Sequence, residues 1–594
     1  MNLHRYIVAG CVSALMLAGC KDFLDLQPKD QLTESYTFTN YQNFKTYAWN
    51  FYSAFPGYSG AAPNSEINAD LFLNANPNGI SDWIWQRQTI PSENTTDYTA
   101  VYSRIRDINI MLANIDKATT LSDADRKHWR AVGYFFRAFN YYLLVNKFGG
   151  VPYIDKPLSD TDKDLLTAPR TPRAEITGKL LEDLKWAETN IKTDGDGENT
   201  VDVHVVRAFI TRFGVMEGAW RKYHQLGDPK PYYQAATAAG EKLMASFPKP
   251  APNYDDDFNS ESLAGVPGIL LYRRYEIGQI VHSLASLARN SAGRWDLTKK
   301  AADMYLMRDG QTRWTSPQFQ GDKSPYTEFR SRDRRLYFTV SPPYAVKTVH
   351  PSYEFTLTNN PADREYIDTM ANISSEKRKT LPVLNWQGIV LRQEPHFVDF
   401  PQGQPFCVTY TGYRFYKFSN KIARIQNQDI NDAPIFRMGE VLVNYAEAKY
   451  ELGEFNQAVA NATINVLRER GAVAPLQVGA IPNDPQRDPG VEPVLWEIRR
   501  ERAVELMGEG FRFDDLRRWK KMEYAVTQKL GRWIKKGTDV GADAKIPILN
   551  NATEGYIAYE GVPPAPWPEY YYLYPIPSNE RVLNPNLEQN PGWK

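Results

Sequence analysis

The chain has 594 residues, enough for one large composite domain or for two to four ordinary ones. It carries 70 Lys and Arg against 70 Asp and Glu, so there is no net charge to attract nucleic acid or an anionic membrane surface. The content of 42% hydrophobic and 24% charged residues is typical of a globular protein, and 36 Tyr against 27 Phe predict many half-exposed rings.

The first 19 residues predict a signal peptide. Arg5 supplies the positive start, and the apolar run 7–17 is too short to span a bilayer. The run ends in Leu-Ala-Gly-Cys, the pattern of a bacterial lipoprotein cleaved before its cysteine. We therefore expect lipid on Cys20 and a tether over residues 20–42, rather than a plain secretory signal with an incidental cysteine. Only Cys407 then remains, which predicts no internal disulfide.

Residues 43–245 predict an N-terminal helical-repeat region. Apolar spacing indicates helices near 43–55, 97–116, 122–148, 172–192 and 203–223, with Ser122 as a cap and Gly149 at a stop. After residue 226, small residues recur at helical spacing, which lets paired helices approach closely, as in tetratricopeptide repeats.

A long loop over residues 56–91 interrupts this region. It carries Asp70, Trp83 and Trp85 among many Gly, Pro and Asn residues. Loops of this length inside a compact protein are usually functional. The two tryptophans either form a ligand platform or cap a hydrophobic cluster beneath the loop, and the sequence favours neither.

Residues 246–432 predict a loop-rich lobe in which Trp295 and Trp314 have polar neighbours. The segment 194–199, within the N-terminal helical-repeat region, is similar to the middle of a calcium loop. Lys192 and Val203 stand where the first and last ligands would be required, so we read it as a turn. We expect no metal site and no cofactor.

Residues 433–594 predict a second helical repeat and then a charge-rich segment over 494–519, VLWEIRRERAVELMGEGFRFDDLRRW, which begins as a helix. Gly508 and Gly510 should end this helix. Each carboxylate has an arginine three or four residues away, which holds it ionised. This favours structural ion pairs over an acid–base pair among Glu505, Glu509 and Asp515.

Several segments resemble the SusD/RagB family, the nutrient-binding lipoproteins of the outer membrane in certain Gram-negative bacteria. They are RAVGYFFRAFNYYLLVNKFGGVPYI (130–154), DMYLMRDG (303–310), VELMGEGFRFDDLRRW (504–519) and YPIPSNERVLNPNLEQNPGW (574–593). Arg334, Leu467 and Gly471 depart from the family pattern. The resemblance spans nearly all of the mature chain. It implies a mainly α, SusD-like fold built on tetratricopeptide-type helical repeats with an irregular loop-rich lobe.

The resemblance also implies a function at the cell surface. The protein would be lipid-anchored on the exterior of the outer membrane and would bind an oligosaccharide or polysaccharide. It would deliver that ligand to a SusC-like TonB-dependent transporter without catalysis. A peptide or another nutrient is the alternative ligand. A sugar packs its C–H face on an aromatic ring, so we expect ligand contacts from Trp83 or Trp85 and from Trp295 or Trp314, with Asp70 at the polar rim.

An enzyme is the remaining alternative. The sequence has no HExxH, GxSxG, P-loop or CxxC motif. A glycoside hydrolase needs only two facing carboxylates, however, and Asp70, Asp296 and Glu93 lie near the aromatic loops. The simpler interpretation is that such carboxylates accept hydrogen bonds from sugar hydroxyls.

Overall fold

The computed structural model describes residues 37–59, 62–74, 80–288, 295–344, 346–349, 354–374, 379, 383–384, 390–391, 396–397, 408–419 and 427–594. The predicted lipid site Cys20 and the thiol Cys407 lie outside these residues. Within them, no helix combines the length and the hydropathy needed to cross a bilayer.

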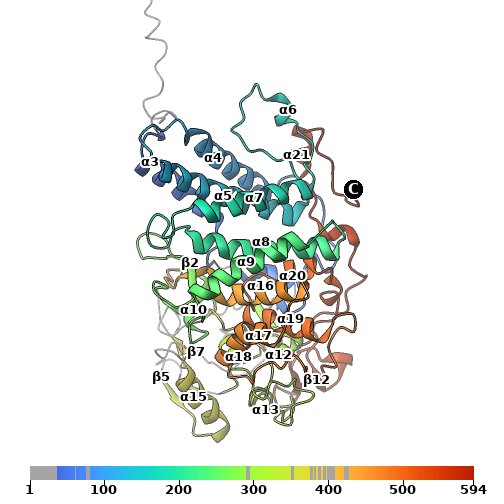
Figure 1. Ribbon diagram of the computed structural model, residues 1–594. Helices are drawn as coiled ribbons and strands as arrows, with labels where there is room; N and C mark the ends of the chain where they lie inside the picture. The colour runs from blue at the N-terminus through green and yellow to red at the C-terminus, as the bar shows by residue number, and fades with distance from the viewer. Residues whose placement is uncertain are drawn as a thin grey trace, which may run out of the picture.

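The described chain is mainly helical, which confirms the predicted fold class (Figure 1). The N-terminal helices are α3 (Tyr41–Ala48), η2 (Trp49–Ala54), η3 (Ala62–Asn68), η4 (Thr95–Thr99), α4 (Ala100–Asn114), α5 (Asp123–Phe148), α6 (Lys163–Leu166), α7 (Arg173–Asn190), α8 (Val203–Tyr223) and α9 (Lys230–Ser246). Successive long helices pack against one another from α4 to α9 and form layers in Figure 1.

The C-terminal part of the chain is also helical. They are α16 (Met438–Glu451), α17 (Gln457–Ala462), α18 (Ile464–Gly471), α19 (Pro493–Glu505), α20 (Arg512–Arg518), η6 (Met522–Tyr524), η7 (Leu549–Asn551), η8 (Glu569–Tyr572) and α21 (Ser578–Leu583). Because α16 packs on α8, α9 and α19, it joins the two helical regions into one body.

Local sequence signals set the helix ends, as predicted. The Ser122 side chain accepts the Asp125 amide hydrogen at 3.1 Å and caps α5. Gly149 ends α5 with a φ of 74°, in the left-handed region that favours glycine. Gly508 and Gly510, with φ of 78° and 87°, form the turn between α19 and α20.

Small residues allow α8 and α9 to approach closely. A Cβ added at Gly214 would lie 2.5 Å from the Tyr232 carbonyl oxygen, and one added at Gly218 would lie 2.6 Å from the Tyr233 ring. The predicted close approach of paired helices is therefore present. Their assignment to the tetratricopeptide class stays a prediction.

The lobe consists of short elements, as the sequence predicts. Its helices are α10 (Asp256–Asn259), α11 (Leu284–Ala288), α12 (Lys299–Met304), α13 (Pro325–Phe329), α14 (Arg334–Thr339) and α15 (Pro361–Ile373).

The strands of the described chain form two-stranded sheets: β1 (Phe72–Asn74) with β3 (Trp295–Leu297), β2 (Ile269–Arg273) with β10 (Ala433–Arg437), β4 (Val346–Val349) with β5 (Glu354–Leu357), β6 (Val383–Leu384) with β7 (Val390–Leu391), β8 (His396–Phe397) with β9 (Val408–Thr409), and β11 (Trp533–Lys535) with β12 (Glu554–Tyr556). Of these pairs only β8–β9 is parallel.

The main hydrophobic core combines the first and last parts of the chain. It includes Phe136 of α5, Leu516 of α20 and Trp593 of the tail, whereas the lobe has a second cluster around Tyr305 and Tyr413. The predicted boundaries at 245 and 432 stay predictions, since a shared core does not by itself define domains.

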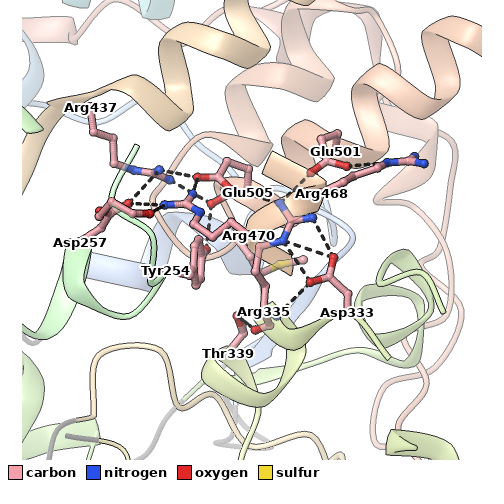
Figure 2. A network of polar contacts seen from close by, with 12 residues as sticks. Tyr254, Asp257, Asp333, Arg335, Thr339, Arg437, Arg468, Arg470, Glu501 and Glu505 are labelled. Atoms are coloured by element: carbon pink, nitrogen blue, oxygen red, sulfur yellow. Dashed lines mark hydrogen bonds and ion pairs between the residues drawn. The ribbon is translucent and has the colours of Figure 1, made fainter. Parts of the chain in front are cut away.

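The charged residues of α19 are buried in an ion-pair network (Figure 2). The Glu505 carboxylate is 0% exposed and pairs with Arg335 at 3.1 Å, with Arg437 at 2.5 Å and with Arg470. Burial alone would raise the pKa of Glu505, but the attraction of these three arginines holds that pKa well below its usual range. An ionised, enclosed carboxylate supports the structural interpretation of this segment.

Most partners in this network come from other elements. Arg335 lies in α14, Arg437 ends β10 and Arg470 lies in α18, so Glu505 connects α19 to three neighbours. Pairs at the predicted spacing of three also occur, such as Arg518 with Asp515 at 2.8 Å. The network is therefore mainly a set of tertiary contacts, and only partly a ladder along one helix.

Candidate functional site

The first predicted pair of tryptophans lies against the C-terminal tail. Trp83 is 8% exposed, and its ring centre lies 4.5 Å from that of Tyr574 and 6.3 Å from that of Trp593. Trp85 is half-buried against the same core. This packing corresponds to the second of the two alternatives from the sequence, in which the tryptophans cap a hydrophobic cluster. A ligand role for these two rings stays a prediction, and Trp83 would first have to be uncovered.

The two predicted aromatic segments meet through backbone pairing. β1 runs antiparallel to β3, with Leu73 opposite Asp296 and Asn74 opposite Trp295. Trp295 is 3% exposed inside the second core, so in this structure its ring is enclosed by packing. Its predicted contact with a ligand remains a prediction, whereas the approach of the two segments is a finding.

Asp70 lies at the start of this pairing and anchors two cations. Its carboxylate accepts hydrogen bonds from Arg512 at 2.8 and 2.9 Å and pairs with Lys300 Nζ at 2.8 Å. Burial would raise the pKa of Asp70, yet these cations hold it below its usual range. Asp70 is 2% exposed, whereas Lys300 is partly exposed, so Asp70 mainly positions Lys300.

A depression of about 670 Å³ opens beside Asp70 and Lys300. Its walls come from α12, the segment 486–489, η6 and β12, which lie far apart in the sequence. The lining combines charged groups, amides and aromatic rings, among them Asp303, Arg313, Asp488, Lys521, Tyr524, Gln528 and Tyr556. A surface of this composition can pack an apolar ligand face and hydrogen-bond its polar edge.

One wall of the depression holds Tyr556 in place. The Tyr556 hydroxyl donates to Asp322 Oδ2 at 2.8 Å, and Arg313 pairs with the same oxygen at 2.6 Å. Arg313 also reaches Asp303 at 3.1 Å. Burial opposes ionisation of Asp322, but the bond from Arg313 and the attraction of Lys299 lower its pKa overall. Because Arg313 holds the Asp322 carboxylate in place, the hydrogen bond to Asp322 also holds the Tyr556 ring in place.

Another part of the lining has a similar arrangement around Tyr524. Its hydroxyl donates to Asp488, which also pairs with Lys521 at 2.7 Å. Lys300 Nζ lies 4.8 Å from the centre of the Tyr524 ring, a cation–π contact. Burial and the hydrogen bond to Asp488 raise the pKa of Tyr524, so this hydroxyl stays protonated.

Trp314 borders the depression. It lines a small adjoining cavity together with Lys300, Asp303 and Trp496, and these three residues also line the depression. Its ring is half-exposed, and the Arg313 guanidinium lies 4.9 Å from the ring centre. Of the predicted ligand residues, Asp70 lines the depression, whereas Trp314 lines the adjoining cavity.

The carboxylates suggested for hydrolysis have separate environments. Asp70 is ion-paired as described above. Asp296 is 1% exposed and accepts the amide hydrogens of Tyr410 and Thr411 at 2.6 and 3.1 Å. Glu93 is exposed and accepts a hydrogen bond from the Asn579 side chain at 3.2 Å. None of these contacts links two of the three carboxylates.

Sequence reasoning missed much of this site. Tyr556 lies in the short hairpin β11–β12, and Asp322 in an irregular segment before α13, with no motif around either residue. Tyr524 follows the charge-rich segment but is separated from Lys300 by more than two hundred residues. The excess of tyrosine in the sequence predicts half-exposed rings, but it does not indicate which tyrosines line the site.

Two family models match the chain. The model of the SusD family matches residues 273–593, and a model described as "Starch-binding associating with outer membrane" matches residues 22–202. SusD-like protein P2 of Formosa agariphila is 32% identical over 87 residues. That match spans 14% of this chain and 17% of the relative's length.

Solved structures share the fold over nearly the whole chain. A SusD-like protein from Bacteroides fragilis has a TM-score of 0.67 at 18% identity, covering 96% of this chain and 100% of its own. A SusD-like carbohydrate-binding protein from the same species has a TM-score of 0.66 at 17% identity, covering 93% and 100%. Surface glycan-binding protein A from Bacteroides thetaiotaomicron has a TM-score of 0.57 at 15% identity, also covering 93% and 100%.

Proposed function

Because the chain belongs to the SusD/RagB family, we propose that it captures an oligosaccharide or polysaccharide at the cell surface and passes it to a SusC-like TonB-dependent transporter. The observation that carries the binding step is the depression between Tyr524 and Tyr556. Two of the structural relatives are described as carbohydrate- or glycan-binding proteins, which supports this class of ligand.

The depression suits a neutral, hydroxyl-rich ligand. Its charged groups already pair with one another, as Arg313 does with Asp303 and Asp322, and Lys521 with Asp488. A neutral ligand breaks none of these pairs, yet its hydroxyls find both donors and acceptors along the walls. Tyr556 provides aromatic surface for C–H groups in the depression, and Trp314 provides it in the adjoining cavity. A peptide is the alternative ligand, because the same walls would accept its amide groups.

The proposal includes a surface location and no catalysis. Lipid on Cys20 would attach the protein to the outer membrane, facing the exterior, and would leave the folded part free to meet the transporter. Asp70, Asp322 and Asp488 are paired with cations that lower their pKa values, which leaves these carboxylates ready to accept hydrogen bonds and unsuited to donating a proton to a glycosidic oxygen.

Native gel electrophoresis through soluble polysaccharides tests the binding step. Starch, arabinoxylan, galactomannan and laminarin would be used separately, and retention of the wild-type protein identifies its polymer. Tyr556→Ala and Trp314→Ala should each weaken binding about thirtyfold, corresponding to roughly 2 kcal/mol for one stacking ring. Tyr556→Phe keeps the ring but loses the bond to Asp322, so its loss should be smaller.

Leu226→Ala serves as the control, because Leu226 is 44% exposed and does not line the depression. Circular dichroism would first establish that each variant is folded. If folded Tyr556→Ala and Trp314→Ala proteins are retained like wild type, the ligand does not bind in this depression. Release of reducing sugar from the retained polymer would instead indicate hydrolysis.

A further inference from the structure

A second and larger depression, of about 1,080 Å³, lies on another side of the molecule. Its walls come from η2, the segment 198–199, residues 261–280 around β2, and the start of β10. In Figure 1, β2 lies at the left and β12 at the lower right, so this depression is well separated from the candidate site. The two share no lining residue.

An exposed tryptophan stands in this second depression on a rigid support. Trp49 is 47% exposed, although a free indole ring prefers to be buried. Its ring centre lies 5.0 Å from that of Tyr52, which in turn packs on Phe136 at 5.1 Å. The Tyr52 hydroxyl accepts the Val201 amide hydrogen at 2.8 Å. Trp49 is therefore held in place while much of its surface meets solvent.

A second ring is fixed on the facing segment. Asn199 donates from its side-chain amide to the Tyr272 carbonyl at 2.9 Å and accepts the Tyr272 amide hydrogen at 3.0 Å. Asn199 reaches this position with a φ of 55°, in the left-handed region that asparagine tolerates. This two-way contact joins the turn before α8 to β2, and it holds the half-buried Tyr272 in the lining.

Polar groups surround the two rings. Glu198 and Gln279 are exposed on the rim, and Arg274 pairs with Glu276 at 3.0 Å. The lining holds four carboxylates and two arginines, which disfavours a strongly anionic ligand. Rigid rings within a mixed polar rim again suit the C–H faces and hydroxyls of a sugar.

We propose that this second depression is an additional glycan-binding site, in which Trp49 is the stacking residue. The class of ligand rests on the proposed function; the existence of a separate site rests on Trp49 and its support. Two sites on one chain would let a long polysaccharide be held at two points, which raises its apparent affinity above that of either site.

Isothermal titration calorimetry with short ligands tests this proposal. Maltohexaose, xylohexaose, mannohexaose and laminarihexaose would each be titrated into the full mature protein. Where one binds, we expect two molecules per wild-type chain, one per Trp49→Ala chain and one per Tyr556→Ala chain. Trp49→Phe should keep two, and Leu226→Ala controls for loss of an exposed apolar side chain.

Each outcome separates this proposal from the preceding one. If folded Trp49→Ala protein binds as many molecules as wild type, the second site is refuted while the first stands. If Trp49→Ala loses one molecule and Tyr556→Ala loses none, the second site stands and the first is refuted. Binding of no hexaose at any concentration would overturn the glycan class for both depressions.

Discussion

Arg502→Ala gives the sharpest test of the interpretation that the α19–α20 charges are structural. Arg502 and Asp515 side chains are 4% and 5% exposed, and Arg502 Nε lies 2.7 Å from the carboxylate. Arg502 also donates to the Asn444 side-chain oxygen at 2.6 Å. The substitution removes both contacts and leaves their partners buried.

The expected loss can be worked from these contacts. Removing one partner of a buried ion pair costs about 3–5 kcal/mol. Asp515 keeps its pair with Arg518 at 2.8 Å, which places the electrostatic part near about 3 kcal/mol. The two buried methylenes lost from the arginine stem add about 1.6 kcal/mol. We therefore expect the free energy of unfolding to fall by about 4–5 kcal/mol.

Urea unfolding of the mature protein, followed by circular dichroism and by tryptophan fluorescence, measures this change. Arg364→Ala is the matched control, because the Arg364 and Asp368 side chains are 38% and 56% exposed and their pair should contribute less than about 1 kcal/mol. A loss for Arg502→Ala no larger than that of the control would refute the reasoning. Unchanged stability with lost polysaccharide retention would reassign Arg502 to a binding role.

Three further predictions address the anchor, a buried acid and a helix contact. Cys20→Ala should move the protein from the membrane fraction to the soluble fraction, and a variant that stays membrane-bound would exclude Cys20 as the anchor. Burial raises the pKa of the Glu66 carboxyl from 4.5 to about 8. Between these two pH values the folded protein keeps a proton on Glu66 that the unfolded chain has released. The free energy of unfolding should therefore fall as the pH rises from 5 to 8, and Glu66→Gln should remove the part of this decrease that Glu66 causes. Urea unfolding of both proteins at pH 5 and pH 8 measures the difference. Gly218→Ala places a Cβ 2.6 Å from the Tyr233 ring and should lower stability by about 1–3 kcal/mol in the same assay.

Features determined by neighbouring residues in the sequence were predictable. The Ser122 cap, the Gly149 stop and the turn at Gly508 depend on backbone angles and hydrogen bonds within a few residues.

Features determined by remote contacts were not predictable. Trp83 has polar neighbours in sequence, but Tyr574 and Trp593, which lie about five hundred residues further along the chain, cover it. The arginines around Glu505 likewise come from three separate elements. Tyr556 and Trp49 acquire their significance only from the walls that tertiary packing builds around them, and a single sequence carries no such information.

The contact between Trp83 and the tail constrains when folding can finish. The Trp593 ring stacks on Tyr571 at 5.0 Å, and both rings contact Trp83. A growing chain that has not reached residue 593 leaves this aromatic surface in water, although the N-terminal helices are already synthesised. Completion of the first core therefore waits until residue 593 has been synthesised.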